Sequence, residues 1–146
     1  MIPEFDERGN LPPGIHNATW TEIVTRYATS AHRRDLLDGI LDALRSLRSA
    51  GCATVYLDGS FVTAKARPND FDACWESAGA DLDRLDPELL DFSDKRTVQK
   101  ARYGGELFPA RWPARTDGTT FLDFFQRDHI AKRPKGIIAI DLAGLP

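Results

Sequence analysis

The sequence predicts an α+β domain, because helical and strand-like patterns both occur along the chain. Apolar residues recur at helical spacing within residues 30–51, whereas short β-prone runs occupy residues 53–57, 70–75 and 137–142. A chain of 146 residues is long enough to bury a hydrophobic core of its own. We therefore expect residues 1–146 to form a single domain.

The clearest helix begins after Ser30, which can cap it, and ends near Gly51, which suits a helix stop. Its apolar face consists of Leu36, Leu37, Ile40, Leu41, Leu44 and Leu47. Residues 1–16 are rich in turn formers and predict an extended lead-in. Asn17 or Thr19 can cap a short helix that follows this lead-in.

The stretch Val55–Trp75 predicts a strand, a tight turn, a short helix and a second strand. Gly59 lies in the turn and has no Cβ, so it can take unusual dihedral angles and let a ligand approach the backbone. A helix that begins at Ser60 presents unpaired N–H groups, which suit a phosphate.

The remaining predicted elements are short and are separated by polar loops. They are a helix at 87–90 within an otherwise irregular stretch 76–97, two strands within 97–108 broken at Gly104-Gly105, a helix at 119–128 and a strand at 137–142.

Composition excludes several classes of protein. The net charge of −3 argues against a protein that coats DNA or other nucleic acid non-specifically. No run approaches the roughly 20 apolar residues of a membrane span, and the first residues lack the pattern of a secretory signal. Cys52 and Cys74 lack metal-ligand spacing and are expected to be buried free thiols. We therefore expect a cytoplasmic protein with no membrane partner.

Two acidic residues on one predicted strand indicate a cation site. Asp70 and Asp72 alternate with Phe71 and Ala73, so both carboxylates point to the same face. Two adjacent carboxylates repel each other and are costly to bury unless a cation lies between them. Asp141, in the last apolar run, is either a third carboxylate of this site or a cap near the chain end. Three carboxylates can hold two Mg²⁺ ions, which would support an in-line phosphoryl displacement.

These residues resemble the signature of the nucleotidyltransferase superfamily typified by DNA polymerase beta. In that signature Gly-Ser is followed, after a spacer, by Asp-apolar-Asp on a strand and by a third acid on a later strand. Here Leu57-Asp58-Gly59-Ser60 is followed by nine residues and then by Asp70-Phe71-Asp72-Ala73, and Asp141 fits the third acid. The resemblance covers mainly residues 53–75 and 137–142.

The small size and the early motif look most like the minimal nucleotidyltransferases of bacteria and archaea. The opening IPEFDERGNLPPGIH and the phrase YLDGSFVTAK also resemble a small bacterial family of this kind with no settled function. This resemblance implies a polymerase beta-like fold, with a small mixed β-sheet flanked by helices. It also implies transfer of a nucleotide from ATP or another NTP to a hydroxyl group, with Mg²⁺ or Mn²⁺ as the cofactor.

The resemblance also assigns roles to individual residues. Asp70, Asp72 and Asp141 would be the catalytic and metal-binding acids, with Asp141 also a candidate for accepting the proton of the hydroxyl. Gly59 and Ser60 would hold the β- and γ-phosphates.

The chain departs from the family pattern where many minimal relatives have a basic residue after Gly-Ser, because Phe61 stands there. Lys65 is the candidate for the lost phosphate contact, unless it is an ordinary solvated side chain. Lys100, Arg102 and Lys135 are weaker candidates for neutralising phosphate or binding an acceptor.

Three functions therefore remain open. The first is an active transferase that modifies a protein, as the antitoxin of a toxin–antitoxin pair does, or that modifies RNA, as related toxins do. The second is a binding module with the same fold that neutralises a cognate toxin by covering it. The third is an unrelated α+β protein in which the acidic pair lies in a surface loop.

Overall fold

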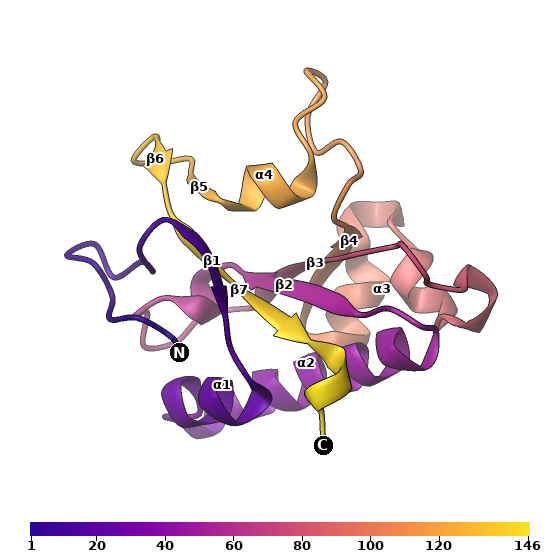
Figure 1. Cartoon of the computed structure of the whole chain (residues 1–146), viewed down its shortest axis with the longest axis horizontal. Helices are drawn as coiled ribbons and strands as arrows, with labels where there is room; N and C mark the ends of the chain where they lie inside the picture. Colours follow the sequence, from indigo (N-terminus) through magenta and orange to yellow (C-terminus); the bar gives the residue numbers. More distant parts are fainter.

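The computed structural model describes residues 1–146 and has a five-stranded sheet at its centre, in the order β1-β7-β2-β3-β4 (Figure 1). The strands are β1 (Gly14–Asn17), β2 (Thr54–Asp58), β3 (Phe71–Trp75), β4 (Gly105–Pro109) and β7 (Gly136–Asp141). β1 runs parallel to β7 and β3 parallel to β4, whereas β2 is antiparallel to both β7 and β3. The predicted α+β class, with a mixed sheet flanked by helices, is confirmed.

Helices α1 (Trp20–Tyr27) and α2 (Ala31–Ser49) lie on one side of the sheet (Figure 1). The Thr19 hydroxyl oxygen accepts the Glu22 N–H at 3.1 Å, and that of Ser30 accepts the Arg33 N–H at 3.1 Å. Each residue thereby satisfies a backbone donor that the first helical turn leaves free. The prediction of both helices, with Thr19 and Ser30 as caps, is confirmed.

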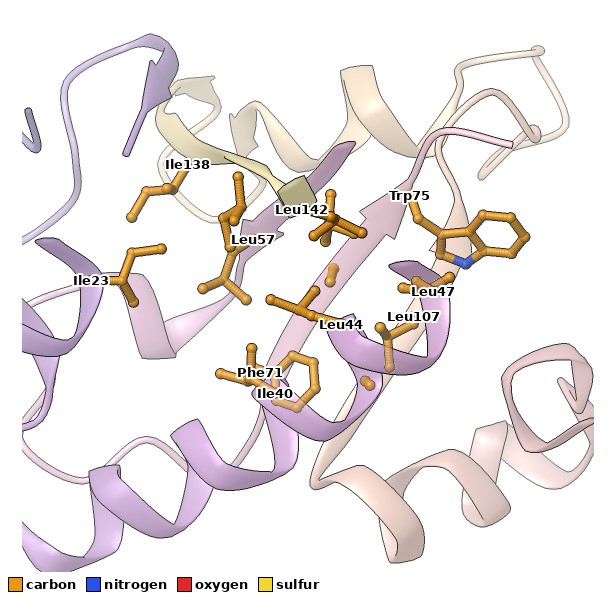
Figure 2. Packing of buried hydrophobic residues seen from close by; sticks show 14 of the residues in the cluster. Ile23, Ile40, Leu44, Leu47, Leu57, Phe71, Trp75, Leu107, Ile138 and Leu142 are labelled. Atoms are coloured by element: carbon orange, nitrogen blue, oxygen red, sulfur yellow. The ribbon is translucent and has the colours of Figure 1, made fainter. Parts of the chain in front are cut away.

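The main core lies between these helices and the sheet (Figure 2). Ile40, Leu44 and Leu47 of α2 pack toward Leu57 of β2 and Phe71 of β3, and all five side chains are essentially inaccessible to solvent. Burial of such side chains stabilises a fold by roughly 1.5–3 kcal/mol each, so this layer fixes the positions of β2 and β3.

Helix α3 (Ser93–Tyr103) packs against β4 and α2, where the sequence predicts a strand before Gly104. That strand prediction is wrong because the helix turns a polar residue inward. Gln99 is fully buried, and its side-chain oxygen accepts the Leu107 N–H at 2.7 Å. The helix ends at Gly104, whose φ of +87° is typical of the residue that follows a helix.

The opposite face of the sheet is covered by α4 (Phe121–Phe125) and by the small hairpin of β5 (Arg127–Asp128) and β6 (Arg133–Pro134) (Figure 1). This side has a smaller apolar cluster that contains Cys74, Phe108, Ala110, Leu122, Phe125 and Ile137. The helix predicted at 119–128 is therefore present in a shorter form, and a hairpin follows it.

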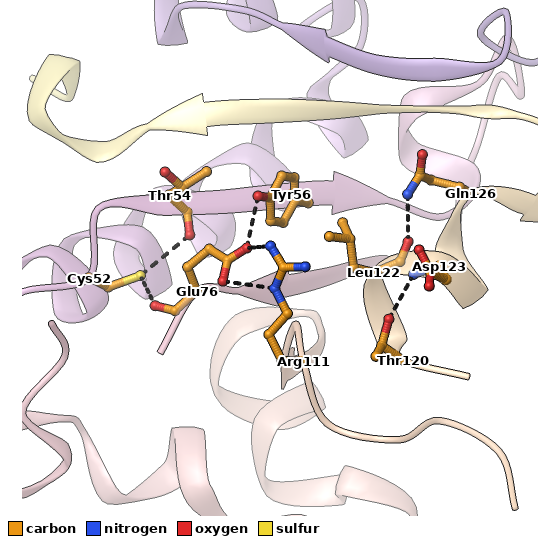
Figure 3. A network of polar contacts seen from close by, with 9 residues as sticks. All are labelled: Cys52, Thr54, Tyr56, Glu76, Arg111, Thr120, Leu122, Asp123 and Gln126. Carbon is orange, nitrogen blue, oxygen red and sulfur yellow. Dashed lines mark hydrogen bonds and ion pairs between the residues drawn. The ribbon is translucent and has the colours of Figure 1, made fainter. Parts of the chain in front are cut away.

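A polar network holds one end of this second face together (Figure 3). The Glu76 carboxylate accepts the Tyr56 hydroxyl at 2.9 Å and the Arg111 guanidinium at 2.8 Å. Arg111 belongs to the segment between β4 and α4, so the network ties that segment to the sheet. Thr120 caps α4 by accepting the Asp123 N–H at 3.2 Å.

Short 3-10 helices complete the chain at η1 (Ser60–Val62), η2 (Leu82–Arg84), η3 (Pro87–Leu90) and η4 (Leu142–Gly144). η3 matches the helix predicted at 87–90, whereas the helix predicted from Ser60 to about Lys65 is reduced to the single turn η1, which ends at Val62. Cys52 and Cys74 are buried free thiols, as predicted. No helix combines the length and the apolar character needed to cross a membrane.

Candidate functional site

Three neighbouring strands bring one carboxylate each to the same level of the sheet. Asp72 on β3 pairs in register with Asp58 on β2 and with Glu106 on β4. Because side chains alternate along a strand, Phe71 and Ala73 enter the main core, whereas Asp72 points to the face covered by α4. We call Asp58, Asp72 and Glu106 the acidic row.

Asp70 adds a fourth acid beside this row. It lies directly before β3, two residues from Asp72 and outside the strand itself. The charges of Asp70 and Asp72 are close enough that the Asp70 carboxylate raises the pKa of Asp72. The Asp70–Asp72 pair is therefore part of one acidic surface and not of a separate loop.

The turn after β2 contacts the acidic row directly. Gly59 has φ +87° and ψ −175°, a backbone region that is essentially restricted to glycine. A Cβ added to Gly59 would lie 2.9 Å from the Asp72 Oδ2 atom and 3.0 Å from the Asp72 nitrogen. Glycine is thus required twice, by its backbone angles and by the close approach of Asp72.

Arg33 of α2 holds the loop that follows this turn. Its side chain is almost completely buried and donates to the carbonyl oxygens of Phe61 at 2.8 Å and Thr63 at 3.1 Å, and also to that of Lys65. The Tyr27 hydroxyl donates to the next carbonyl, that of Val62, at 2.9 Å. The end of α1 and the first turn of α2 therefore fix the backbone between the Gly-Ser turn and β3.

The acids differ in their partners. The Lys135 ammonium group forms a short ion pair with Asp58, and both side chains are largely buried, at 15% and 6% exposed. Glu106 accepts Lys100 at 3.0 Å and Arg96 at 3.3 Å. The carboxylates of Asp70 and Asp72 form no ion pair and accept no hydrogen bond within the chain.

Arg96 reaches Glu106 from a strained segment. Asp94, Lys95 and Arg96 all have positive φ, although they lie within the range of α3. The left-handed conformation costs a non-glycine residue roughly 1–2 kcal/mol, and it is rare in consecutive residues. The regular part of α3 therefore begins near Thr97, and the preceding turn lies at the edge of the acidic row.

Burial raises the pKa of Asp72 to about 7, and the charges of Asp58, Asp70 and Glu106 act in the same direction. Lys135 opposes this shift but is itself paired with Asp58. Burial and the nearby Glu106 charge also raise the pKa of Asp70. The centre of the row is thus a carboxyl group whose charged form lacks a compensating cation.

Two cavities meet at Asp72. The first has a volume of about 400 Å³ and is lined by Gly59, Ser60 and Lys135 on the sheet side and by residues of α4 and β5 on the other. There the Phe124 ring stacks on His129 with centroids 4.0 Å apart. The second cavity, of about 340 Å³, contains Glu106, Arg96 and the phenylalanines of α4. Asp72, Phe124 and Phe125 line both cavities.

The prediction that Asp141 joins Asp70 and Asp72 is wrong. β7 is antiparallel to β2 and places Asp141 opposite Thr54, whereas Asp72 lies opposite Asp58 at the other end of β2. Four residues of extended chain separate the two levels, about 13 Å. Asp141 instead caps η4 by accepting the Ala143 N–H at 3.0 Å, which is the alternative role that the sequence left open.

Of the other residues that the sequence predicts for the site, some lie at the two cavities and some lie away from them. Ser60 lines the first cavity beside Gly59, whereas Lys65 is exposed and lines neither cavity. Lys100 contacts the acidic row through Glu106. Arg102 pairs instead with Asp42 of α2 and with Glu88, away from both cavities.

Sequence reasoning missed Glu106 and the pairing of Asp58 with Lys135. A signal for Glu106 exists, because it is the only charged residue of the run Gly105–Pro109 and alternates there with buried Leu107. The strand predicted after Gly104-Gly105 is present as β4, and only the strand predicted before it is wrong. Asp58 lies one residue beyond the strand predicted at 53–57, but it ends β2 and is buried.

The acidic residues fit a cation only in part. No group of three or more His, Cys, Asp or Glu side chains is arranged to hold a metal ion. Mg²⁺ commonly binds through one or two carboxylates together with substrate phosphates and water. The unpartnered Asp70 and Asp72 carboxylates meet that lesser requirement.

The fold and the site define a small α+β protein with an acidic groove between a mixed sheet and a short phenylalanine-rich helix. The chain belongs to DUF6932, a family of unknown function, whose model matches residues 3–141. Comparison with curated proteins and with solved structures gave no significant match.

Proposed function

We propose that this chain is a metal-dependent nucleotidyltransferase with a polymerase beta-like fold, which moves a nucleotide from ATP or another NTP to a hydroxyl group of a protein or RNA. The observation that supports the proposal most strongly is the contact between Gly59 and Asp72. It joins a turn suited to phosphate with two carboxylates that have no cation of their own. A nucleotide that arrives with its metal ion would supply what both parts lack.

In this proposal the polyphosphate lies against Gly59 and Ser60 in the first cavity, and Asp70 and Asp72 hold Mg²⁺ or Mn²⁺. When bound, the metal would neutralise charge on the phosphates. The acceptor oxygen forms a bond to the α-phosphorus, the bond from this phosphorus to the bridging oxygen breaks, and pyrophosphate leaves. Glu106 takes the place that the sequence gave to Asp141 and accepts the proton of the hydroxyl.

The test is transfer of label from α-labelled ATP and the other NTPs in the presence of Mg²⁺ or Mn²⁺. Candidate acceptors are total RNA and the protein encoded beside this chain, a candidate cognate toxin. The variant Asp70→Asn/Asp72→Asn should abolish labelling, whereas Asp141→Asn should label at the wild-type rate. Absence of labelling with every nucleotide, metal and acceptor would refute the proposal.

A second candidate function is supported by the three ion pairs at the two ends of the acidic row. Lys135 already neutralises Asp58, and Lys100 with Arg96 neutralises Glu106. A chain with this arrangement could act as a binding module that neutralises a partner toxin without chemistry. In that case Asp70→Asn/Asp72→Asn would still neutralise the partner, and loss of neutralisation would contradict this candidate.

A further inference from the structure

The position that carries a basic residue in many minimal nucleotidyltransferases cannot do so here. Phe61 is fully buried in the main core, where the centroid of its ring lies 5.4 Å from the centroid of the Tyr27 ring. A cation at this position would therefore point away from the first cavity. The positive charge for a phosphate beside Gly59 and Ser60 must come from another part of the chain.

Lys135 is a largely buried cation that faces this turn. It lines the first cavity together with Gly59, Ser60 and Asp72. Its backbone is fixed directly before β7, because its N–H donates to the Gln126 carbonyl oxygen at 3.0 Å. The ammonium group contacts Asp58, the residue immediately before Gly59. Backbone and side chain are thus both anchored at the wall of the cavity.

An ammonium group has three N–H donors, and the chain engages Lys135 through the Asp58 carboxylate alone. The remaining donors are available to a ligand in the cavity. Two other basic side chains line the cavity, and both are exposed. Arg127 donates to the Lys132 carbonyl oxygen at 3.0 Å, and His129 Nε2 lies 2.9 Å from the Phe124 carbonyl oxygen. Lys135 is therefore the best placed of the three to bind an anion beside the turn.

We propose that Lys135, oriented by Asp58, binds the polyphosphate of the nucleotide in the first cavity. This inference rests on the proposed function, because it assigns the phosphate end of the same site. The acidic groups Asp58 and Asp72 face Lys135, so a phosphate would approach the lysine together with a divalent cation that offsets those charges.

Inorganic tripolyphosphate with Mg²⁺ is the probe, since it has the phosphates of an NTP and no base or sugar. Isothermal titration calorimetry should show binding to the wild-type chain and a loss of about tenfold or more in affinity for Lys135→Gln, as expected when a charge-assisted hydrogen bond is removed. Lys132→Gln is the matched control, because Lys132 lies in the same segment, is exposed and does not line the cavity. Its affinity should stay within twofold of wild type.

Lys135→Gln leaves the buried Asp58 without its cation, so that variant could lose its fold. The double variant Asp58→Asn/Lys135→Gln removes both charges and keeps two polar groups that can bond to each other. It should fold, as shown by circular dichroism, and bind tripolyphosphate as weakly as the single variant. Wild-type affinity in either folded variant, or no binding by the wild-type chain, would overturn the inference.

The two proposals fail in different ways. If label is transferred and Lys135→Gln has an unchanged KM for the NTP, the role of Lys135 is refuted and the transferase is supported. If tripolyphosphate binding depends on Lys135 but no acceptor is labelled, the phosphate site is supported and the transferase is refuted.

Discussion

Gly59 and Asp72 are in such close contact that a single methyl group on Gly59 would overlap the Asp72 carboxylate, at 2.9 Å from Oδ2. The two residues belong to the two halves of the sequence motif, and the antiparallel pairing of β2 with β3 brings them together. The motif is therefore one physical unit, in which the backbone of the turn positions the central acid.

The contact predicts that Gly59→Ala is more damaging than an ordinary glycine substitution. Gly118 provides the control, since its φ of +90° is similar but nothing lies within 4 Å of an added Cβ. We expect Gly118→Ala to cost roughly 1–2 kcal/mol of unfolding free energy from backbone strain. Gly59→Ala should cost at least about 1 kcal/mol more, because Asp72 must move. Urea denaturation of both variants measures the difference, and equal losses would contradict the contact.

The raised pKa of Asp72 predicts that stability falls as the pH rises from about 4 to 7. The pKa of this carboxyl is about 7 in the folded chain, against an ordinary value of 3.8. Between these values the folded chain binds more protons than the unfolded chain, so raising the pH favours unfolding. Asp72 contributes at most about 4 kcal/mol to this fall in the free energy of unfolding, because one pKa unit corresponds to about 1.4 kcal/mol.

Urea denaturation at pH 4.5, 6 and 7.5 with EDTA tests this prediction. Asp72→Asn should lose most of the decline in stability, and it should be more stable than wild type at pH 7.5. Asp91→Asn is the control, because hydrogen bonds from Ser93 lower the pKa of the partly exposed Asp91 and it is already charged in this range. A wild-type slope in Asp72→Asn would show that other groups cause the decline.

Local patterns predicted the elements that position the site, because the residues responsible are close together in the sequence. Thr19 and Ser30 cap the helices that follow them directly, and alternation within β3 is enough to place Asp72 on the face opposite Phe71 and Ala73. The sequence pattern does not predict α3, because the buried polar residue Gln99 occupies a position where helical periodicity requires an apolar residue.

The third acid depends on strand direction, which no local pattern reveals. If β7 ran parallel to β2, its last residue, Asp141, would lie at the same end of the sheet as Asp58. The observed antiparallel pairing reverses this and leaves Asp141 beside Thr54. The parallel neighbour of β3 is β4, which comes from a segment without an evident motif and contributes Glu106.

Because Glu106 lies in the acidic row and Asp141 does not, we expect substitutions of these two residues to differ in their effect on kcat. Under the proposed function, Glu106→Gln should lower kcat by about a hundredfold or more, as expected for loss of a proton acceptor, with a small change in the KM for the NTP. Asp141→Asn should leave both constants unchanged. Labelling rates measured over a range of NTP concentrations separate the two constants. A larger effect of Asp141→Asn than of Glu106→Gln would identify Asp141, and not Glu106, as the proton acceptor.

The buried Arg33 predicts a structural dependence of the site on α2. Arg33→Met would leave the carbonyl oxygens of Phe61, Thr63 and Lys65 without their donor. Because a buried acceptor that loses its partner costs roughly 1–3 kcal/mol, and the loop can recover some contacts with water, we expect a total loss of about 2–4 kcal/mol. Arg34→Met is the control, since exposed Arg34 makes only a long contact of 3.3 Å to the Ala28 carbonyl.

The same pair of variants tests whether the loop itself is released. Limited proteolysis should cut Arg33→Met within residues 63–69 at a protease concentration that leaves wild type and Arg34→Met intact, because Arg33 supplies donors to three carbonyls of this loop. Tripolyphosphate affinity should fall as well, since the Gly59–Ser60 turn precedes the released segment directly. An Arg33→Met chain with wild-type stability and an uncut loop would show that Tyr27 and the core around Phe61 hold the turn without the arginine.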